Sequence, residues 1–269
     1  MNVIQAIILA IVEGITEFLP ISSTAHMKFT NPLIGVSNSP YVEMFEVVIQ
    51  LAAILSVVIL YWKKFFDFKR VNFYVKLIIA VIPALIVGAL FKKHIDAALG
   101  NLYFIAAVMI GGGILLLFID NFFKTTIISE EEKITNKKSF IIGCFQTLSI
   151  VLPGLSRSAA TIIGGMSQKL TRSLAAEFSF LLAVPTMLAA SVKSFYDVYK
   201  EHPEVLNKSN MGILGIGSLV SFIVALIAVK FFIGYLQKHG FKLFGFYRII
   251  AGLVMLTLLL LGINLNIMG

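Results

Sequence analysis

The chain has 269 residues, of which 58% are hydrophobic and 13% charged, and its mean hydropathy is +0.94. This composition excludes an ordinary soluble domain and is typical of polytopic membrane proteins. In a chain this apolar, the net charge of +8 indicates lysines at the membrane surface and contact with anionic lipids, and it does not predict a nucleic-acid partner.

The first segment of unusual polarity is residues 13–26, EGITEFLPISSTAH. Polar groups at membrane depth are costly unless they pair or line a cavity, so this cluster is predicted to be a functional site. Pro20 ends one short helix, and the serines after it can cap a second. The next stretch, residues 28–40, is expected to be a surface loop because it contains prolines, asparagines and a glycine.

Six apolar runs approach the length that a membrane span requires. They are expected at about residues 44–62, 74–91, 102–119, 176–195, 211–232 and 246–263. Pro83 predicts a kink in the second run, and the glycines at 111–113 predict a close helix contact in the third. Cys144 lies in a further apolar stretch and is expected to be a small packed side chain.

A second interrupted segment follows the polar stretch 121–138. Its apolar sequence breaks at Pro153 and Gly154 and continues as LSRSAAT. Each half of the chain then contains one interrupted segment and three spans. The spacing supports a repeat, since Pro20 precedes Glu46 by 26 residues and Pro153 precedes Glu177 by 24.

The predicted fold is therefore an all-α polytopic membrane protein made of two inverted repeats. Each repeat has one re-entrant pair of broken helices and three transmembrane helices, and such broken helices meet near the membrane midplane. The chain would form a single integral membrane domain, with repeat 1 at about 1–120, a cytoplasmic loop at about 121–138 and repeat 2 at about 139–269.

The distribution of basic residues predicts the orientation. With this topology one side carries twelve: Lys63, Lys64, Lys69, Arg70, Lys124, Lys133, Lys137, Lys138, Lys169, Arg172, Lys238 and Lys242. The other side carries five: Lys28, Lys92, Lys93, Lys200 and Lys208. The positive-inside rule then places the richer side in the cytoplasm, and both termini and the mouth of the first interrupted segment outside.

Glu13 and Glu17 are four residues apart and share one helix face. Two ionised carboxylates this close repel in a low dielectric, so they would share a proton or hold a cation. Oxygen ligands of this kind favour Mg²⁺ or Ca²⁺. The alternative is that both carboxylates face water at the mouth of a surface helix.

Ser23 and His26 are three residues apart and would share a face of the second short helix. A histidine there can be a general acid or base, a nucleophile or a metal ligand, although a lone histidine in apolar surroundings is more often structural. The other histidines fall in polar connections and are expected to be solvated: His94, His202 and His239.

The segment PGLSRSAAT supplies a complementary group. The residues after Pro153 and Gly154 would begin a helix, where free N–H groups, hydroxyls and the guanidinium of Arg157 form a phosphate site. Arg157 could instead contact lipid headgroups. The candidate phosphate-binding residues are Arg157, Ser156, Ser158, Thr161, Ser22 and Thr24. Residues that could support this site, or simply pack helices, are Gln146, Glu46, Gln50 and Glu177.

Carboxylates, a cation, a serine, a histidine and an arginine are together the parts that phosphoryl transfer needs. The substrate is expected to be an amphiphile that carries phosphate. The rival expectation is a secondary transporter or flippase for a phosphorylated lipid, because broken helices in inverted repeats also serve alternating access.

The two motifs, EGITEFLPISSTAH and PGLSRSAAT, resemble the signatures of the bacterial undecaprenyl-diphosphate phosphatase family, which is associated with bacitracin resistance. The resemblance extends to FEVVIQLAAIL after Glu43 and AAEFSFLLAVP around Glu177, and so covers most of the chain. Ala25 and Ala159 stand where the family pattern has glycine, and alanine would be strained if either position needed a positive φ.

The resemblance implies a bacterial inner-membrane enzyme that uses a divalent cation to hydrolyse undecaprenyl diphosphate to the monophosphate, which recycles the carrier lipid of cell-wall synthesis. By position, Glu13 and Glu17 match the acidic pair that positions the cation, and Arg157 would hold the diphosphate. Ser23 would attack the terminal phosphorus while His26 or Glu17 handles the proton. Direct attack by His26 or by metal-activated water stays open.

Overall fold

The structure of the protein is a computed structural model that describes residues 1–67, 69–125 and 127–263. This part of the chain is mainly helical, and its only β-type pairing is an isolated bridge between Ile128 and Leu170. Six of its helices are long and apolar enough to cross a membrane, which confirms the predicted all-α polytopic class: α3 (Pro40–Leu60), α5 (Val71–Leu90), α7 (Leu102–Phe122), α10 (Arg172–Glu201), α11 (Lys208–His239) and α12 (Lys242–Leu260).

Four shorter helices form two helical hairpins. The first hairpin joins α1 (Val3–Thr16) to α2 (Ser23–Leu33), and the second joins α8 (Asn136–Val151) to α9 (Arg157–Ser167). The longest of these four has 16 residues, or about 24 Å, which is less than the roughly 30 Å of a bilayer core. The short helices α4 (Trp62–Phe65), α6 (Lys92–Leu99), η1 (Glu131–Lys133) and η2 (Pro203–Val205) lie in connections.

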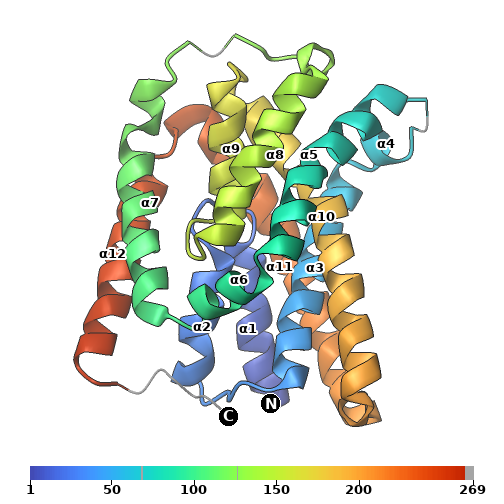
Figure 1. Ribbon diagram of the computed structural model, residues 1–269, viewed down its shortest axis with the longest axis vertical. Helices are drawn as coiled ribbons and strands as arrows, with labels where there is room; N and C mark the ends of the chain where they lie inside the picture. The colour runs from blue at the N-terminus through green and yellow to red at the C-terminus, as the bar shows by residue number, and fades with distance from the viewer. Residues whose placement is uncertain (68, 126, 264–269) are drawn as a thin grey trace.

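The two hairpins enter the helix bundle from opposite ends. In Figure 1 the hairpin α1–α2 rises from the end where the N-terminus and the last turn of α12 lie, the hairpin α8–α9 descends from the other end, and their tips approach each other in the middle. Their packing is reciprocal, since α1 packs against α11 of the second half and α8 packs against α5 of the first. The symmetric relation of the halves as inverted repeats stays a prediction.

Helix starts follow from local side-chain caps. Asn2 accepts a hydrogen bond from the amide of Gln5, whose side chain accepts one in return from the amide of Asn2, so these residues form a capping box for α1. Ser39 caps α3 directly before Pro40, which suits the first helical position. Further caps are Asn101 for α7, Thr135 for α8, Thr171 for α10 and Asn207 for α11.

Close packing fixes the first hairpin inside the bundle. A Cβ added at Gly14 would lie 2.8 Å from the carbonyl oxygen of Ser221, so glycine allows α1 to approach α11 closely. At the hairpin tip the buried ring of Phe18 meets Phe180 of α10 edge to face, with ring centroids 5.2 Å apart. These contacts hold the polar tip at a defined depth.

The predicted glycine contact in the third span is confirmed. A Cβ at Gly113 would lie 2.9 Å from the carbonyl oxygen of Gly245, and α7 packs along α12. Helix α5 continues through Pro83. The predicted spans are correct in number, but the helices extend further, and α10 and α11 reach 30 and 32 residues. The polar ends of these helices project beyond the apolar runs that predict them.

Two local predictions are wrong. Helix α2 continues to Leu33, so residues 28–33 are not a loop, and burial of Phe29 and Asn31 outweighs the helix-breaking tendency of Pro32 near the helix end. Cys144 is exposed, because the buried residues of α8 are its neighbours on another face: Ser139, Ile142, Gly143 and Gln146.

Candidate active site

The two hairpin tips have the same backbone geometry. Ser22 and Ser156 adopt positive φ values of 71° and 76°, which are uncommon for residues other than glycine. Each serine is the N-cap of the following helix, and its Oγ accepts a 3.3 Å hydrogen bond from the amide of Ala25 or Ala159. The two alanines therefore lie in regular helix, and their expected strain does not arise. Both hairpins present the start of a helix at the centre of the protein.

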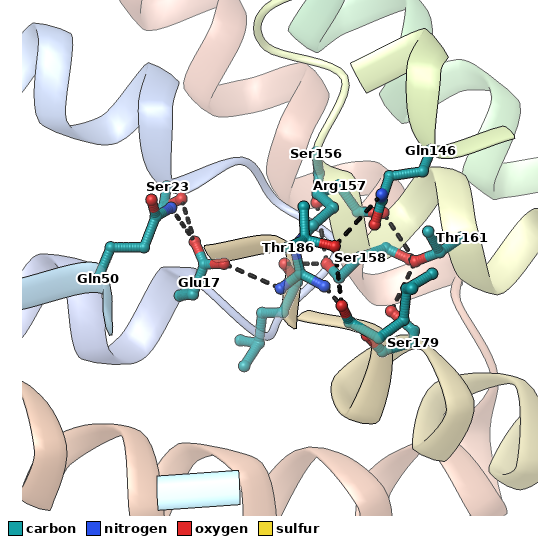
Figure 2. Close-up of polar contacts among 12 residues, drawn as sticks. Glu17, Ser23, Gln50, Gln146, Ser156, Arg157, Ser158, Thr161, Ser179 and Thr186 are labelled. Carbon is teal, nitrogen blue, oxygen red and sulfur yellow. Dashed lines mark hydrogen bonds and ion pairs between the residues drawn. The ribbon is translucent and has the colours of Figure 1, made fainter. Parts of the chain in front are cut away.

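Glu17 connects the two hairpins at this centre. Its Oε2 accepts hydrogen bonds from Ser23 Oγ at 2.7 Å and from Gln50 Nε2 at 2.9 Å. Its Oε1 forms a 2.9 Å ion pair with Nη2 of Arg157 from the second hairpin (Figure 2). The Glu17 and Arg157 side chains are only 3% and 9% exposed, so water screens their attraction little. This arrangement brings the acidic, hydroxyl and cationic groups of the two motifs together.

Arg157 has a second partner. Its Nη1 donates to the carbonyl oxygen of Ser179 on α10 at 3.1 Å, while its buried Nε has no partner among the described residues. The sequence predicts that the guanidinium faces a phosphate, but in this structure it is oriented by Glu17 and Ser179. These two bonds use two of the five N–H groups of the guanidinium, and Arg157 lines one of two cavities at the centre, where an anion could be bound.

Two hydroxyls of the second motif are used inside the protein. Ser158 and Thr161 are fully buried and line neither of the two cavities at the centre. Ser158 Oγ donates to the carbonyl oxygen of Leu19 at 2.9 Å and lies 2.9 Å from Ser156 Oγ. Thr161 Oγ1 lies 2.6 Å from Ser179 Oγ (Figure 2). These two residues tie the hairpins to each other and to α10.

His26 lines neither cavity, although Ser23 lines both. Its Nδ1 donates to the carbonyl oxygen of Ser22 at 2.7 Å, so Nε2 of the neutral ring accepts from the hydroxyl of Tyr247, also at 2.7 Å. Burial lowers the pKa of His26, the bond to Ser22 opposes this, and the charge of Arg248 lowers the pKa further. Three residues advance a helix by about 300°, so the His26 side chain is rotated by about 60° from that of Ser23 around α2 and reaches Tyr247 instead of the cavities.

Glu13 is a buried acid close to Glu17 and Glu46. Its Oε1 is buried and has no hydrogen-bond partner in the described part of the chain. Burial raises the pKa of the Glu13 carboxyl well above its ordinary value, and the carboxylates of Glu17 and Glu46 raise it further. The alternative that the acidic pair faces water at a helix mouth is wrong, because both acids are buried.

Two cavities meet at Ser23, Thr24 and Gln50, which line both. The first has a volume of about 660 Å³ and a mixed wall in which the polar and charged residues include Glu13, Lys28, Asn38, Glu43, Glu46 and Asp96. The second has a volume of about 780 Å³ and a mainly apolar wall that includes Ala84, Leu85, Ile95, Ile150, Met187 and Ala190. Glu17, Ser156 and Arg157 lie at the polar part of this second cavity. A more polar space and an apolar space that meet at the hydroxyl of Ser23 suit an amphiphile.

The supporting residues divide into two groups. Gln50 donates a hydrogen bond to Glu17. Gln146 lines the apolar cavity, and its Oε1 has no partner among the described atoms. Glu46 lines the polar cavity and accepts a hydrogen bond from Asn31. Glu177 does not belong to the site. It forms an ion pair with Lys64, which also pairs with Glu131, and Glu131 in turn pairs with Arg70. The charge of Glu177 is therefore neutralised in a separate cluster.

Sequence reasoning missed Ser179, Tyr247 and Arg248. Ser179 lies two residues after Glu177 in an apolar run, and a polar residue in that position was the available signal. Of the histidines expected to be solvated, His94 and His239 are exposed and His202 is partly buried.

Fold and site together define a polytopic membrane protein whose polar centre is built from two broken helical hairpins. The family model for bacitracin resistance protein BacA matches residues 6–254, and the chain belongs to this family. It is 53% identical to the undecaprenyl-diphosphatase of Flavobacterium psychrophilum over 259 residues, which cover 96% of each chain. It is 48% identical to that of Porphyromonas gingivalis strain W83 over 99% of this chain and all of the relative, and 43% identical to that of Bdellovibrio bacteriovorus over 99% of both.

Proposed function

We propose that the protein is an integral membrane phosphatase that hydrolyses undecaprenyl diphosphate to undecaprenyl phosphate and inorganic phosphate. This reaction recycles the lipid carrier for cell-wall synthesis and fits a family described by bacitracin resistance. Relatives that match nearly the full chain at 42–53% identity carry the name undecaprenyl-diphosphatase. The observation that carries the proposal is the 2.7 Å hydrogen bond from Ser23 Oγ to Glu17 Oε2, at the junction of a polar and an apolar cavity.

Ser23 is the nucleophile in this proposal, and Glu17 is its base. Ser23 Oγ attacks the terminal phosphorus, its proton passes to Glu17, and the bond from phosphorus to the bridging oxygen breaks, which releases undecaprenyl phosphate. Water then attacks the phosphoserine, releases phosphate and restores the hydroxyl. His26 is disfavoured as nucleophile because its ring is paired with Ser22 and Tyr247 outside both cavities. Attack by water with Ser23 as a hydrogen-bond donor is the remaining variant of the mechanism.

The diphosphate is held by groups from both hairpins. The guanidinium of Arg157 and the N–H groups at the starts of α2 and α9 supply positive charge and donors for the phosphate oxygens. Thr24 and Ser156 line the same space and can add hydroxyl contacts. The prenyl chain extends into the apolar cavity, where water is excluded from the hydrocarbon.

A divalent cation, Mg²⁺ or Ca²⁺, would be held by Glu13 and Glu17. The described residues contain no cluster of three or more acidic, histidine or cysteine ligands, so the protein offers only the two carboxylates. One of their oxygens, Oε1 of Glu13, has no hydrogen-bond partner among the described residues. Two carboxylates fit Mg²⁺ in particular, since this ion commonly keeps waters and takes the rest of its ligands from substrate phosphate. When bound, the cation neutralises phosphate charge.

We place the protein in the bacterial cell membrane, with both termini and the opening of the first hairpin outside. The support is the charge count of twelve against five basic residues. Thiol labelling from outside intact cells tests it in a Cys144→Ser background: a cysteine introduced at Asn38 should react, and one at Lys137 should not. The opposite pattern would reverse the orientation.

The function is tested with purified protein in detergent. Phosphate release from undecaprenyl diphosphate should require the cation and should be lost in Glu17→Ala and Arg157→Ala. Ser167→Ala, which changes a hydroxyl at the far end of α9, should keep wild-type activity. Binding of the lipid without phosphate release would favour a transporter or flippase and contradict the proposal.

A further inference from the structure

Arg248 is a fully buried cation that the proposed reaction does not use. It lies on α12 with 0% exposure, in a helix that is otherwise apolar around it. A charged side chain at membrane depth is expensive and marks a functional position when it faces the protein interior. None of the ion pairs in the described part of the chain includes Arg248.

Every hydrogen bond of Arg248 goes to a backbone carbonyl oxygen. Nη1 donates to the first hairpin tip and to the second, Nη2 donates to the second tip and to α7, and Nε donates to α7. The acceptors are Pro20 (3.1 Å) and Leu155 (2.7 Å) for Nη1, Gly154 (2.8 Å) and Val108 (3.5 Å) for Nη2, and Met109 (3.2 Å) for Nε. One guanidinium thus spans both hairpin tips and the neighbouring helix.

The carbonyls at the hairpin tips precede the two functional turns directly. Pro20 is two residues before Ser22, and Leu155 is one residue before Ser156. Both serines have the positive φ that sets the direction of the next helix. A positive φ at a residue other than glycine persists only where the surrounding structure fixes it. The planar guanidinium of Arg248, with several N–H donors in fixed directions, is well suited to fix these two turns.

We infer that Arg248 is a positioning residue, which locks the two hairpin tips together so that Ser23 from the first and Arg157 from the second meet Glu17 at one cavity. This inference rests on the proposed phosphatase function for its activity measurements, but not for its structural measurement. Neutral packing residues would fill the same volume but would leave the carbonyl oxygens that Arg248 contacts without a donor.

Two adjacent glycines on α7 provide a test that leaves Arg248 itself unchanged. A Cβ at Gly112 would collide with Nη2 of Arg248 and lie 2.9 Å from its Cζ, so Gly112→Ala displaces the guanidinium. A Cβ at Gly111 has no neighbour within 4 Å, so Gly111→Ala is the matched control with the same change in helix propensity. Arg248→Lys and Arg248→Met remove most or all of the donors directly.

The experiment measures kcat and KM for undecaprenyl diphosphate together with amide hydrogen exchange of the purified protein. Gly112→Ala and Arg248→Lys should lower kcat/KM by about 10-fold to 100-fold, since a displacement of about 1 Å at a reacting group has effects of this size. Exchange should rise in peptides that cover residues 18–23 and 153–158 and stay unchanged in α5 and α11. Gly111→Ala should match the wild type in both measurements.

Two results would overturn the inference. One is wild-type kcat/KM and wild-type exchange of both tips in folded Gly112→Ala and Arg248→Lys. The other is amide exchange that rises evenly over all helices, together with a loss of activity that only matches the unfolded fraction. That result would show that Arg248 stabilises the whole protein and does not position the two tips. Gly112→Ala decides the question if Arg248→Met does not fold. If the wild type released no phosphate, the proposed function would be wrong. The exchange pattern would still test whether Arg248 holds the two hairpin tips together.

Discussion

Oε2 of Glu17 accepts a 2.7 Å hydrogen bond from the hydroxyl of Ser23, and the residues come from opposite sides of one broken-helix turn. The same carboxylate pairs through Oε1 with Arg157 of the second hairpin. The proposed base, nucleophile and phosphate-binding guanidinium are therefore in direct contact. The following predictions arise from these contacts.

Glu17→Gln should reduce kcat by about 10²-fold to 10⁴-fold, because the amide keeps the size of the side chain but cannot take the proton of Ser23. Phosphate release measured at saturating substrate tests this. Glu130→Gln is the control, since Glu130 is an exposed acid in the loop at the far end and pairs only with Lys133 among the described residues. Equal activity of Glu17→Gln and the wild type would exclude Glu17 as the base.

Removal of one partner of the buried pair should destabilise the protein. Arg157→Met leaves Glu17 uncompensated and should lower the free energy of unfolding by about 3–5 kcal/mol, whereas the double change with Glu17→Gln should recover a large part of this loss. Thermal unfolding in detergent measures both. Lys133→Met is the control, because its pair with Glu130 is exposed on both sides (61% and 59%), and it should lose less than about 1 kcal/mol. A double variant less stable than Arg157→Met would contradict the pairing energy.

Chelation should abolish phosphate release, and Mg²⁺ or Ca²⁺ should restore it. Glu13→Gln should raise the cation concentration for half-maximal activity by about 10-fold, which corresponds to about 1.4 kcal/mol of binding free energy. Cation titrations of the wild type, Glu13→Gln and the Glu130→Gln control provide the comparison. Unchanged activity in the presence of a chelator would exclude the cation, and an unchanged midpoint in Glu13→Gln would exclude Glu13 as its ligand.

The sequence predicts the fold well where hydrophobic length decides it. Six spans and two interrupted segments follow from apolar runs and from Pro20 and Pro153, because backbone in lipid must satisfy its own hydrogen bonds. It also predicts the Glu17, Ser23 and Arg157 group, because polar residues cluster there against the apolar background.

The remaining features depend on tertiary contacts. In the sequence Arg248 is one more charge near a span end, since one-dimensional hydropathy does not show which carbonyls surround a side chain. His26 is turned toward Tyr247 because the cap geometry at Ser22 sets the rotation of α2. Glu177 lies outside the site and is neutralised by Lys64 from a segment more than 100 residues earlier in the chain. Residue spacing alone contains none of this information.

The most direct test of the account is to identify the residue that carries phosphate during turnover. Purified protein is mixed with undecaprenyl diphosphate labelled in its terminal phosphate, quenched within the first turnover and digested. The account predicts an acid-stable phosphoserine at Ser23 that is absent in Ser23→Ala and present in His26→Ala. Label on His26, or full phosphate release by Ser23→Ala, would contradict it.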